Sequence, residues 1–262
     1  MSETVIQVSS LGKRIKGKTI LEDISFEINQ GDCVALIGPN GAGKTVLMSC
    51  ILGDKKPSSG QVLIEGKAGK AKNQIAVLLQ ENTIPNSLKV SELIAFFQAI
   101  SDNPLTNQEV QNLLRFKEDQ YQQFADKLSG GQRRLLAFVL CLIDRPKILF
   151  LDEPTAGMDT STRQRFWEIV NELKKSGVTI LYSSHYIEEV EHTADRILVL
   201  HQGKLIRDTT PYAMRHEEKE KQVTLPSSFV SIVHGLPDIY EITEKRDVIS
   251  FMTKDIEKVW QL

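Results

Sequence analysis

Two glycine-rich stretches of this sequence have the composition that phosphate binding requires. The first is GPNGAGKT at residues 38–45, which fits the phosphate-loop pattern G-x4-G-K-[ST]. Small residues there let backbone N–H groups close around the β- and γ-phosphates of a nucleotide, and Lys44 adds a compact positive charge. The Thr45 hydroxyl can ligate Mg²⁺, because hard cations prefer oxygen ligands. The residues expected to contact the nucleotide are Gly38, Pro39, Asn40, Gly41, Ala42, Gly43, Lys44, Thr45 and Val46.

The second stretch is LSGGQ at residues 128–132, which leads into the apolar, helix-like run RRLLAFVLCLI. The start of a helix offers unpaired backbone N–H groups and a positive dipole end, and both suit an anion. One chain therefore carries two devices for binding phosphate. The sequence raises the question of whether both serve the same nucleotide.

Acidic side chains follow the apolar run ILFLDEP at residues 148–154. Asp152 and Glu153 would end a strand, and ligands bind at that end of the strands in open α/β sheets. We expect Asp152 to hold Mg²⁺ through water, and Glu153 to orient and polarise the water that attacks the γ-phosphate. The alternative is a turn with two solvated acids.

Two further polar residues end candidate strands. His185 closes TILYSSH, where it could contact the γ-phosphate and the attacking water. Gln80 closes IAVLLQ, where its amide could reach Mg²⁺ or that water. Polar residues commonly end strands for structural reasons, so both assignments depend on the neighbouring motifs.

The apolar runs around these motifs indicate an α/β protein. CVALIG at 33–38 is typical of a buried strand, and KILFLDEP, VTILYSSH and RILVLHQG indicate further strands. A helix is expected between the first two of the later strands, because Phe166, Ile169, Val170 and Leu173 share one helical face and Gly177 suits its C-terminal end. This alternation predicts a three-layer core with a largely parallel sheet.

Changes in composition suggest where the domains begin and end. From residue 81 the pattern becomes polar and helical, with VSELIAFFQAI and TNQEVQNLLRF as short amphipathic helices. The run RHEEKEK at 215–221 indicates a charged linker. We therefore predict a main domain over 3–210 with a helical lobe at 81–145, a linker at 211–221 and a small appendage at 222–262 that mixes short strands with a final helix.

Composition limits the classes of function. The chain has 262 residues, is 41% hydrophobic and 25% charged, and has a net charge of −2. These values are ordinary for a soluble globular protein and give no field that favours nucleic acid or an anionic membrane. Three cysteines without metal-ligand spacing are expected to be buried, reduced thiols.

No segment of the sequence is expected to cross a membrane. The longest apolar run, LLAFVLCLI at 135–143, is too short to span a bilayer. The stretch MSETVIQVSS lacks the basic and apolar regions of a signal peptide. If the protein works at a membrane, another polypeptide must span it.

The order GPNGAGKT, Gln80, LSGGQ, LFLDEP, TAGMD and His185 resembles that of the ATP-binding cassette ATPases, the nucleotide-binding subunits of ABC transporters. The resemblance covers about residues 3–210. It implies the fold of a P-loop NTPase with an N-terminal antiparallel β part, an inserted helical lobe and here a small C-terminal α+β appendage. It also implies an ATPase that uses Mg²⁺, with Thr45, Gln80 and Asp152 toward the metal and Glu153 and His185 as catalytic residues.

The family also implies a head-to-tail dimer, either a homodimer or a heterodimer, with two ATP molecules in the interface. The phosphate loop of one subunit then faces LSGGQ of the other, so the two devices on one chain serve different nucleotides. By this resemblance Asp159 of TAGMD communicates across the dimer. The residues implied to contact ATP in trans are Ser129, Gly130, Gly131 and Gln132, with Asp159 beside them.

One position departs from the family pattern. Most cassettes place an aromatic residue, commonly tyrosine, against the adenine. Aligning KRIKGKTILEDISFEI with that pattern puts Ile15 in the aromatic position, and residues 1–25 contain no aromatic side chain. We expect Ile15 to contact the base without a π face, and the protein to discriminate weakly between purine triphosphates.

The resemblance implies a peripheral ATPase subunit on the cytoplasmic side of the cell membrane that energises separately encoded integral membrane permease subunits. The chain is most similar to the bacterial branch that exports drugs, antibiotics or peptides, with no nucleic acid partner. An alternative is a soluble ABC ATPase in a cytosolic process such as iron–sulfur cluster assembly. A GTPase or small-molecule kinase would share the phosphate loop but not LSGGQ, and the sequence has no NKxD motif.

Overall fold

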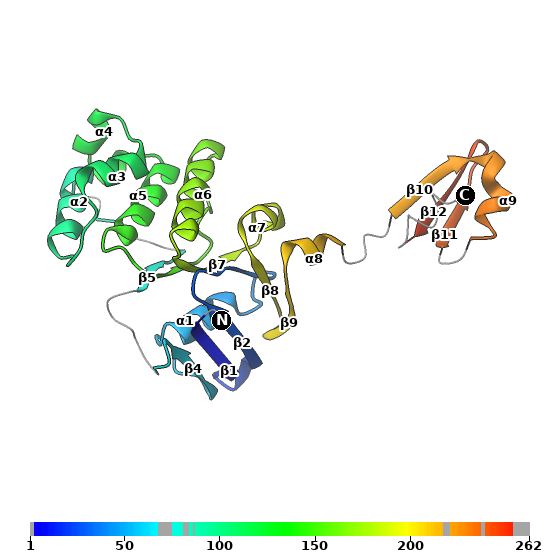
Figure 1. Cartoon of the computed structure of the whole chain (residues 1–262), viewed down its shortest axis with the longest axis horizontal. Coiled ribbons are helices and arrows are strands. Elements are labelled where there is room, and N and C mark those ends of the chain that lie inside the picture. The colour runs from blue at the N-terminus through cyan, green and yellow to red at the C-terminus, as the bar shows by residue number, and fades with distance from the viewer. Residues whose placement is uncertain are drawn as a thin grey trace. The chain divides into compact units, whose positions relative to one another are not determined.

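The chain forms two compact units, Met1–Pro211 and Tyr212–Leu262 (Figure 1). The computed structural model describes residues 3–67, 75–80, 84–85, 87–216, 221–236 and 239–253. Three predicted segments fall partly outside these ranges: the start of the helical lobe at 81–83 and 86, the linker at 217–220, and the final helix at 254–262.

A six-stranded sheet forms the centre of the first unit, in the order β5-β6-β7-β3-β8-β9. All neighbouring strands run parallel except β8 and β9, which are antiparallel. The central strand β3 is buried at all five residues, as its unbroken apolar sequence CVALI predicts for a strand covered on both faces. The strands are β3 Cys33–Ile37, β5 Ile75–Leu78, β6 Ile148–Leu151, β7 Thr179–Ser184, β8 Arg196–His201 and β9 Lys204–Thr209.

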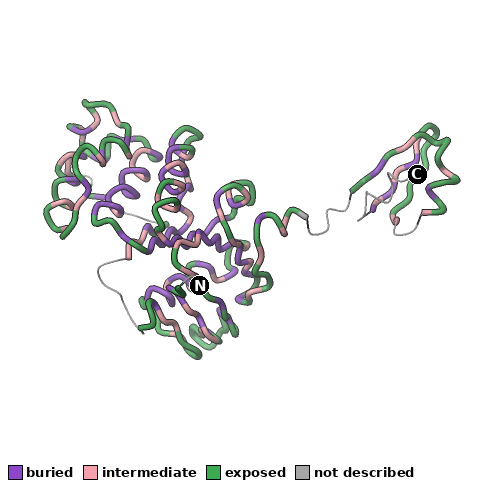
Figure 2. The backbone as a smooth tube through the Cα atoms, viewed as in Figure 1, coloured by how far each residue is buried: buried purple, intermediate pink, exposed green. Residues whose placement is uncertain are grey.

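An antiparallel sheet covers one face of the central sheet. It consists of β1 (Thr4–Ile15), β2 (Lys18–Asn29) and β4 (Ser59–Ile64), in the order β2-β1-β4. Helix α1 (Lys44–Ile51) packs with it, and their apolar side chains share one buried cluster with alternate residues of the central strands. Figure 2 shows buried backbone along these strands and the central sheet. That cluster includes Ile6, Leu21, Ile24, Leu36, Leu47, Phe150 and Leu181.

Helices cover the other face of the central sheet. Phe138 of α5 lies 4.4 Å from Phe166 of α6 between ring centroids, and Trp167 of α6 lies 5.1 Å from Tyr182 of β7. The predicted three-layer α/β fold with a helical lobe is therefore confirmed. The helices are α2 Val90–Ala99, α3 Asn107–Leu114, α4 Glu118–Gln122, α5 Gly130–Leu142, α6 Thr160–Lys175 and α7 Ile187–Thr193, with a 3₁₀ turn at Ala125–Lys127.

The predicted features of α6 are present in the structure. Phe166, Ile169 and Val170 are fully buried on one face of the helix. Gly177 has a φ of +87°, the left-handed conformation that commonly ends a helix. None of the helices in the described ranges is both long and apolar enough to cross a bilayer.

The three cysteines are free thiols, with Cys33 and Cys50 buried and Cys141 partly buried. Burial raises the pKa of the Cys33 thiol to about 12 and that of Cys141 to about 11. Cys33 and Cys141 therefore stay protonated near neutral pH. Burial is as expected for Cys33 and Cys50, whereas Cys141 is less buried than the sequence predicts.

The second unit is a small α+β structure, as predicted. Its sheet has the order β10-β12-β11 with antiparallel pairing, and Val223, Val233, Ile249 and Phe251 form its core. The elements are β10 Lys221–Pro226, a 3₁₀ turn at Ser227–Phe229, α9 Val230–Val233, β11 Ile239–Glu244 and β12 Val248–Thr253. A short helix, α8 (Pro211–His216), occupies the beginning of the segment for which the sequence predicts a linker.

Candidate nucleotide site

The carboxyl ends of four parallel strands bring the predicted site residues to one edge of the central sheet. The phosphate loop follows β3, Gln80 follows β5, the two acids follow β6 and His185 follows β7. One pocket lies at this edge, where an α/β sheet is expected to bind its ligand. It is lined by Ile20, Asn40, Gly41, Ala42, Gly43, Lys44, Thr45, Val46, Gln80, Glu153 and His185.

Close packing explains two glycines of the phosphate loop. A Cβ atom on Gly38 would lie 2.1 Å from the Leu200 carbonyl oxygen, so any side chain there would displace β8. Gly43 has a φ of +108°, and its Cβ would lie 2.7 Å from the Leu21 side chain. Gly43 is also the N-cap of α1 and has no side chain to cap the helix, so the first N–H groups of α1 have no side-chain partner there, and they belong to residues that line the pocket.

Lys44 lies inside the phosphate loop. Its Nζ donates hydrogen bonds to the Gly38 and Pro39 carbonyl oxygens, at 2.7 and 3.4 Å, and the residue is only 6% exposed. The loop thus places a positive charge beside the glycine-rich backbone that lines the pocket, which is the arrangement of an anion-binding loop.

Asp152 is held by two hydroxyl groups. Thr45 Oγ1 donates to Asp152 Oδ2 at 3.0 Å, and Ser183 Oγ donates to Asp152 Oδ1. Ser183 Oγ also accepts the Glu153 N–H at 2.8 Å, so one fully buried hydroxyl contacts both acids. The sequence analysis did not identify Ser183. The signal that could have found it is its position on β7, the strand that pairs with β6.

The Glu153 carboxylate lies between a cation and an imidazole. Its Oε1 is 3.9 Å from Lys44 Nζ, and its Oε2 is 3.4 Å from His185 Nδ1. Glu153 has a φ of +44°, which turns the chain out of strand geometry directly after Asp152. A carboxylate in this position can accept a proton from a water beside the phosphates.

The donor set fits magnesium. Thr45 offers a hydroxyl and Gln80 an amide oxygen in the lining of the pocket, and the Asp152 carboxylate lies behind Thr45, from whose hydroxyl it accepts a hydrogen bond; all three are hard oxygen ligands. Mg²⁺ in nucleotide sites uses one or two carboxylates together with phosphate oxygens and water. Within the described residues, no group of three or more His, Cys, Asp or Glu forms a separate metal cluster.

LSGGQ begins helix α5, as the sequence predicts. Ser129 is the N-cap: its Oγ accepts the Gln132 N–H at 3.2 Å, and Gln132 Oε1 accepts the Ser129 N–H at 3.1 Å. Within the described residues, a Cβ on Gly130 would meet no atom within 4 Å. The start of this helix therefore has open space beside it.

Asp159 lies against LSGGQ of its own chain. A Cβ on Gly131 would be 3.0 Å from Asp159 Oδ2, so a side chain there would press against Asp159. Asp159 caps α6, and the Ser161 hydroxyl and the Thr162 N–H and hydroxyl hold the pKa of its carboxyl below the usual range. Among the described residues, the lining of the phosphate-loop pocket includes neither Asp159 nor any residue of 128–132.

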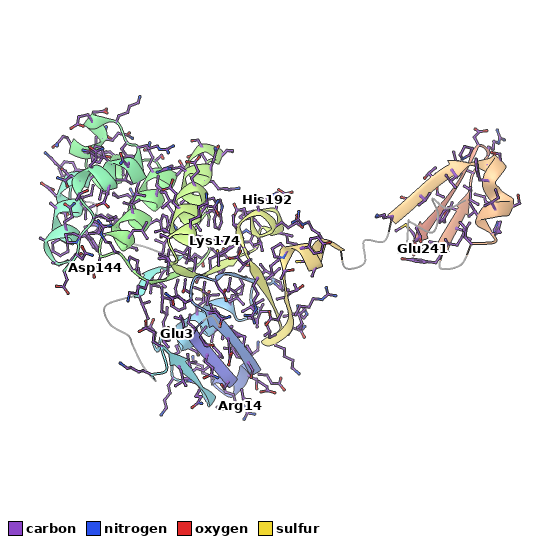
Figure 3. All side chains as sticks on the ribbon, viewed as in Figure 1. Glu3, Arg14, Asp144, Lys174, His192 and Glu241 are labelled. Carbon is purple, nitrogen blue, oxygen red and sulfur yellow. The ribbon has the colours of Figure 1, made fainter. Side chains whose placement is uncertain are left out.

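Ile15 is not among the residues that line this pocket. It is the last residue of β1, pairs with Lys18 in the hairpin to β2 and is 36% exposed; Figure 3 labels its neighbour Arg14 at that end of the antiparallel sheet. Ile20, five residues further along, does line the pocket. Contact between Ile15 and the base remains a prediction.

Known proteins are similar to this chain in sequence and in fold. Residues 21–156 match the family model described as ABC transporter. The Nod factor export ATP-binding protein I of Ralstonia nicotianae is 34% identical over 81% of this chain and 69% of its own length. The probable multidrug ABC transporter ATP-binding protein YbhF of Escherichia coli is 30% identical over 88% of this chain, which spans only 42% of YbhF. A solved ATP-binding subunit of an ABC transporter has a TM-score of 0.71 at 27% identity, covering 81% of this chain and 92% of its own.

Proposed function

Because the chain belongs to the ABC transporter family, we propose that it is an ATPase subunit that energises transport through separate membrane-spanning permease subunits. The observation that carries this proposal is the pocket at the sheet edge, where the phosphate loop, Glu153 and His185 meet. The start of helix α5 at LSGGQ lies outside that pocket, and it supports the proposal because a helix N-terminus suits the phosphate of a second nucleotide.

ATP is bound through its phosphates in this proposal. The N–H groups of residues 38–45 and the ammonium of Lys44 hold the β- and γ-phosphates. Thr45 and Asp152, with Gln80, would hold Mg²⁺, which neutralises charge on the transferred phosphoryl group. Ile20 and Ile15 offer apolar surface toward the nucleoside.

Glu153 activates the attacking water. Its carboxylate accepts a hydrogen bond from the water, orients it toward the γ-phosphate and takes its proton as the P–O bond to ADP breaks. His185, 3.4 Å from the Glu153 carboxylate, donates toward the γ-phosphate and fixes the position of the acid. The products are ADP and phosphate.

The location of LSGGQ supports a head-to-tail dimer. The start of α5 has open space beside Gly130 and lies outside the pocket that holds the phosphate loop. In the dimer, residues 129–132 of one subunit bind the γ-phosphate held by the other subunit, with Asp159 at the same interface. ATP then joins the two subunits and hydrolysis releases them, because the γ-phosphate contact exists only before hydrolysis.

The helical lobe offers an apolar surface to a permease. Phe96 of α2 and Ile100, which directly follows that helix, are 55% and 64% exposed; Phe124 in the lobe and Leu79 just before it are also exposed. Leu79 precedes Gln80, so a partner at this surface would adjoin a residue of the metal site. Relatives that are named for multidrug transport and Nod factor export support an exporter. We propose drug-like or peptide substrates, and a peripheral position on the cytoplasmic face of the membrane.

Hydrolysis by the purified chain tests the first part of the proposal. The wild type should release phosphate from ATP only with Mg²⁺. Glu153→Gln should bind ATP with unchanged affinity, lose turnover and accumulate as an ATP-bound dimer on a sizing column. Glu172→Gln, an exposed acid on α6, is the matched control. Turnover by Glu153→Gln at the wild-type rate would contradict the catalytic assignment.

Copurification tests the second part. The tagged chain, isolated from detergent-solubilised membranes, should bring down a polytopic membrane protein. Recovery from the soluble fraction with cytosolic assembly proteins would instead favour the alternative of a soluble ABC ATPase.

A further inference from the structure

Arg134 lies where helix α5 passes the ends of β5 and β6. It is the fifth residue of α5, half-buried, and two helical turns before Cys141, whose Sγ contacts the Val77 carbonyl oxygen of β5 at 3.5 Å. This face of α5 therefore follows β5 closely. The N-terminal turn of α5 lies in the LSGGQ stretch.

The Arg134 guanidinium binds backbone carbonyl groups of two separate segments. Nη1 donates to the carbonyl oxygens of Leu79 and Gln80, the latter at 3.0 Å. Nη2 donates to Asp152 O at 3.1 Å and contacts Glu153 O at 3.5 Å. Nε donates to Pro154 O at 3.1 Å. One side chain thus binds the backbone of the two segments that carry the predicted ligands of metal and water, Gln80 on one and Asp152 and Glu153 on the other.

These contacts begin where the sheet ends. The strands β5 and β6 are paired up to Leu78 and Leu151, and the Asp152 N–H still donates to the Leu78 carbonyl oxygen at 2.8 Å. The chain then turns away at Glu153, which has a left-handed backbone conformation. Beyond this point the guanidinium of Arg134 joins the two segments in place of the strand ladder.

The chemistry of arginine suits this position. A guanidinium has five N–H donors in a rigid plane, and here all three of its nitrogen atoms are used. Arg134 is half-buried, so its charge is partly removed from water; this burial lowers its pKa, although an arginine stays protonated in proteins. A lysine would offer a point charge and could not reach the same set of carbonyl groups at once.

We infer that Arg134 is a positioning residue for ATP hydrolysis, which fixes the backbone of Gln80 and Glu153 relative to the helix that begins at LSGGQ. This inference rests on the proposed function. In the dimer that start of α5 contacts the partner's nucleotide, while Gln80 and Glu153 act on the chain's own nucleotide. Arg134 therefore joins the trans contact to the cis chemistry, and displacement of α5 moves the ligands of metal and water.

The test compares the full-length wild type with Arg134→Met, Arg134→Lys and the control Arg133→Met. Met preserves the length of the stem and removes every donor. Arg133 is the neighbouring arginine, and its Nη2 donates to the Asp126 carbonyl oxygen at 3.2 Å. The measurements are kcat, ATP affinity of the monomer without Mg²⁺, the Mg²⁺ concentration for half-maximal hydrolysis, and thermal unfolding.

Arg134→Met should lower kcat about tenfold to a hundredfold, the factor that corresponds to charged hydrogen bonds. Its metal-free ATP affinity should stay within about twofold, and it should need about threefold or more Mg²⁺, because Gln80 is no longer fixed. Arg134→Lys should be intermediate, and Arg133→Met should keep the Mg²⁺ requirement of the wild type.

Three results would overturn the inference. One is wild-type kcat in Arg134→Met. Another is a loss of kcat that matches the loss of folded protein with no change in the Mg²⁺ requirement. If Arg134→Met does not fold, Arg134→Lys decides, and a folded Lys variant with wild-type kcat and Mg²⁺ requirement refutes the inference. Absence of hydrolysis in the wild type would instead contradict the proposed function.

Discussion

Replacing Ser183 with alanine removes the hydroxyl group that contacts both acidic residues of the nucleotide site. In the wild type this hydroxyl donates to Asp152 Oδ1 and accepts the Glu153 N–H at 2.8 Å. Ser183 is fully buried and Asp152 is 2% exposed, so the free volume left by the hydroxyl lies away from bulk water. The Asp152 carboxylate and the Glu153 backbone N–H then each lose a partner without gaining one.

The two lost hydrogen bonds set the size of the effect. A hydrogen bond to a charged group contributes about 1.5–3 kcal/mol, and a buried N–H left unpaired costs about 1–3 kcal/mol. The two contacts share one oxygen and are not independent, so we expect Ser183→Ala to lower the free energy of unfolding by about 2–4 kcal/mol. The ATPase rate should also fall about tenfold, because the Glu153 backbone loses the bond that holds its left-handed conformation.

Urea unfolding measures this loss. Trp167, which packs against Tyr182 of the same strand as Ser183, provides the fluorescence signal in a Trp260→Phe background. Ser184→Ala is the matched control: Ser184 is also buried, and its hydroxyl accepts the Tyr186 N–H at 3.0 Å. The control should lose about 1 kcal/mol. A loss in Ser183→Ala no larger than that of the control would refute the reasoning.

Three further predictions concern the dimer, the base and the second unit. Ser129→Arg should abolish hydrolysis while the monomer still binds ATP, and mixing it with Lys44→Ala should restore one composite site; no recovery at any ratio would contradict assembly in trans. Ile15→Tyr should tighten ATP binding by up to about 1–2 kcal/mol, and the wild type should bind GTP within about tenfold of ATP, as titrations of the monomer will show. Deleting 222–262 should leave a soluble chain that binds ATP, and its insolubility would make that segment part of the main domain.

Much of the fold could be predicted because its signals are local. Unbroken apolar runs such as CVALI mark strands that are covered on both faces, and the periodic apolar face of 160–175 marks a helix. Since carboxyl ends of parallel strands meet at one edge, the motifs that end these strands were expected to converge, and the structure brings them to one pocket.

Other features have no local signal. Arg134 binds backbone carbonyl groups, which every residue possesses, so nothing in the sequence of its partners identifies the contact. The approach of Gly131 to Asp159 depends on how α5 packs against α6. Ser183 lies on β7, and its hydroxyl contacts Asp152 and Glu153, which follow the neighbouring strand β6. Such contacts follow from tertiary packing, which periodicity and motif spacing do not encode.

The position of β3 in the sheet has a consequence for synthesis of the chain on the ribosome. This strand is made early, but its neighbours are late in the sequence: Cys33 pairs with Ile180, and Val34 pairs with Arg196. Until those strands leave the ribosome, β3 is an apolar segment with two unpaired edges, which other chains can join. The phosphate loop likewise lacks the Leu200 carbonyl group that Gly38 packs against. The nascent chain therefore acquires its nucleotide site only after the residues of β8 are made, and a chaperone that covers β3 during this interval would raise the yield of active protein.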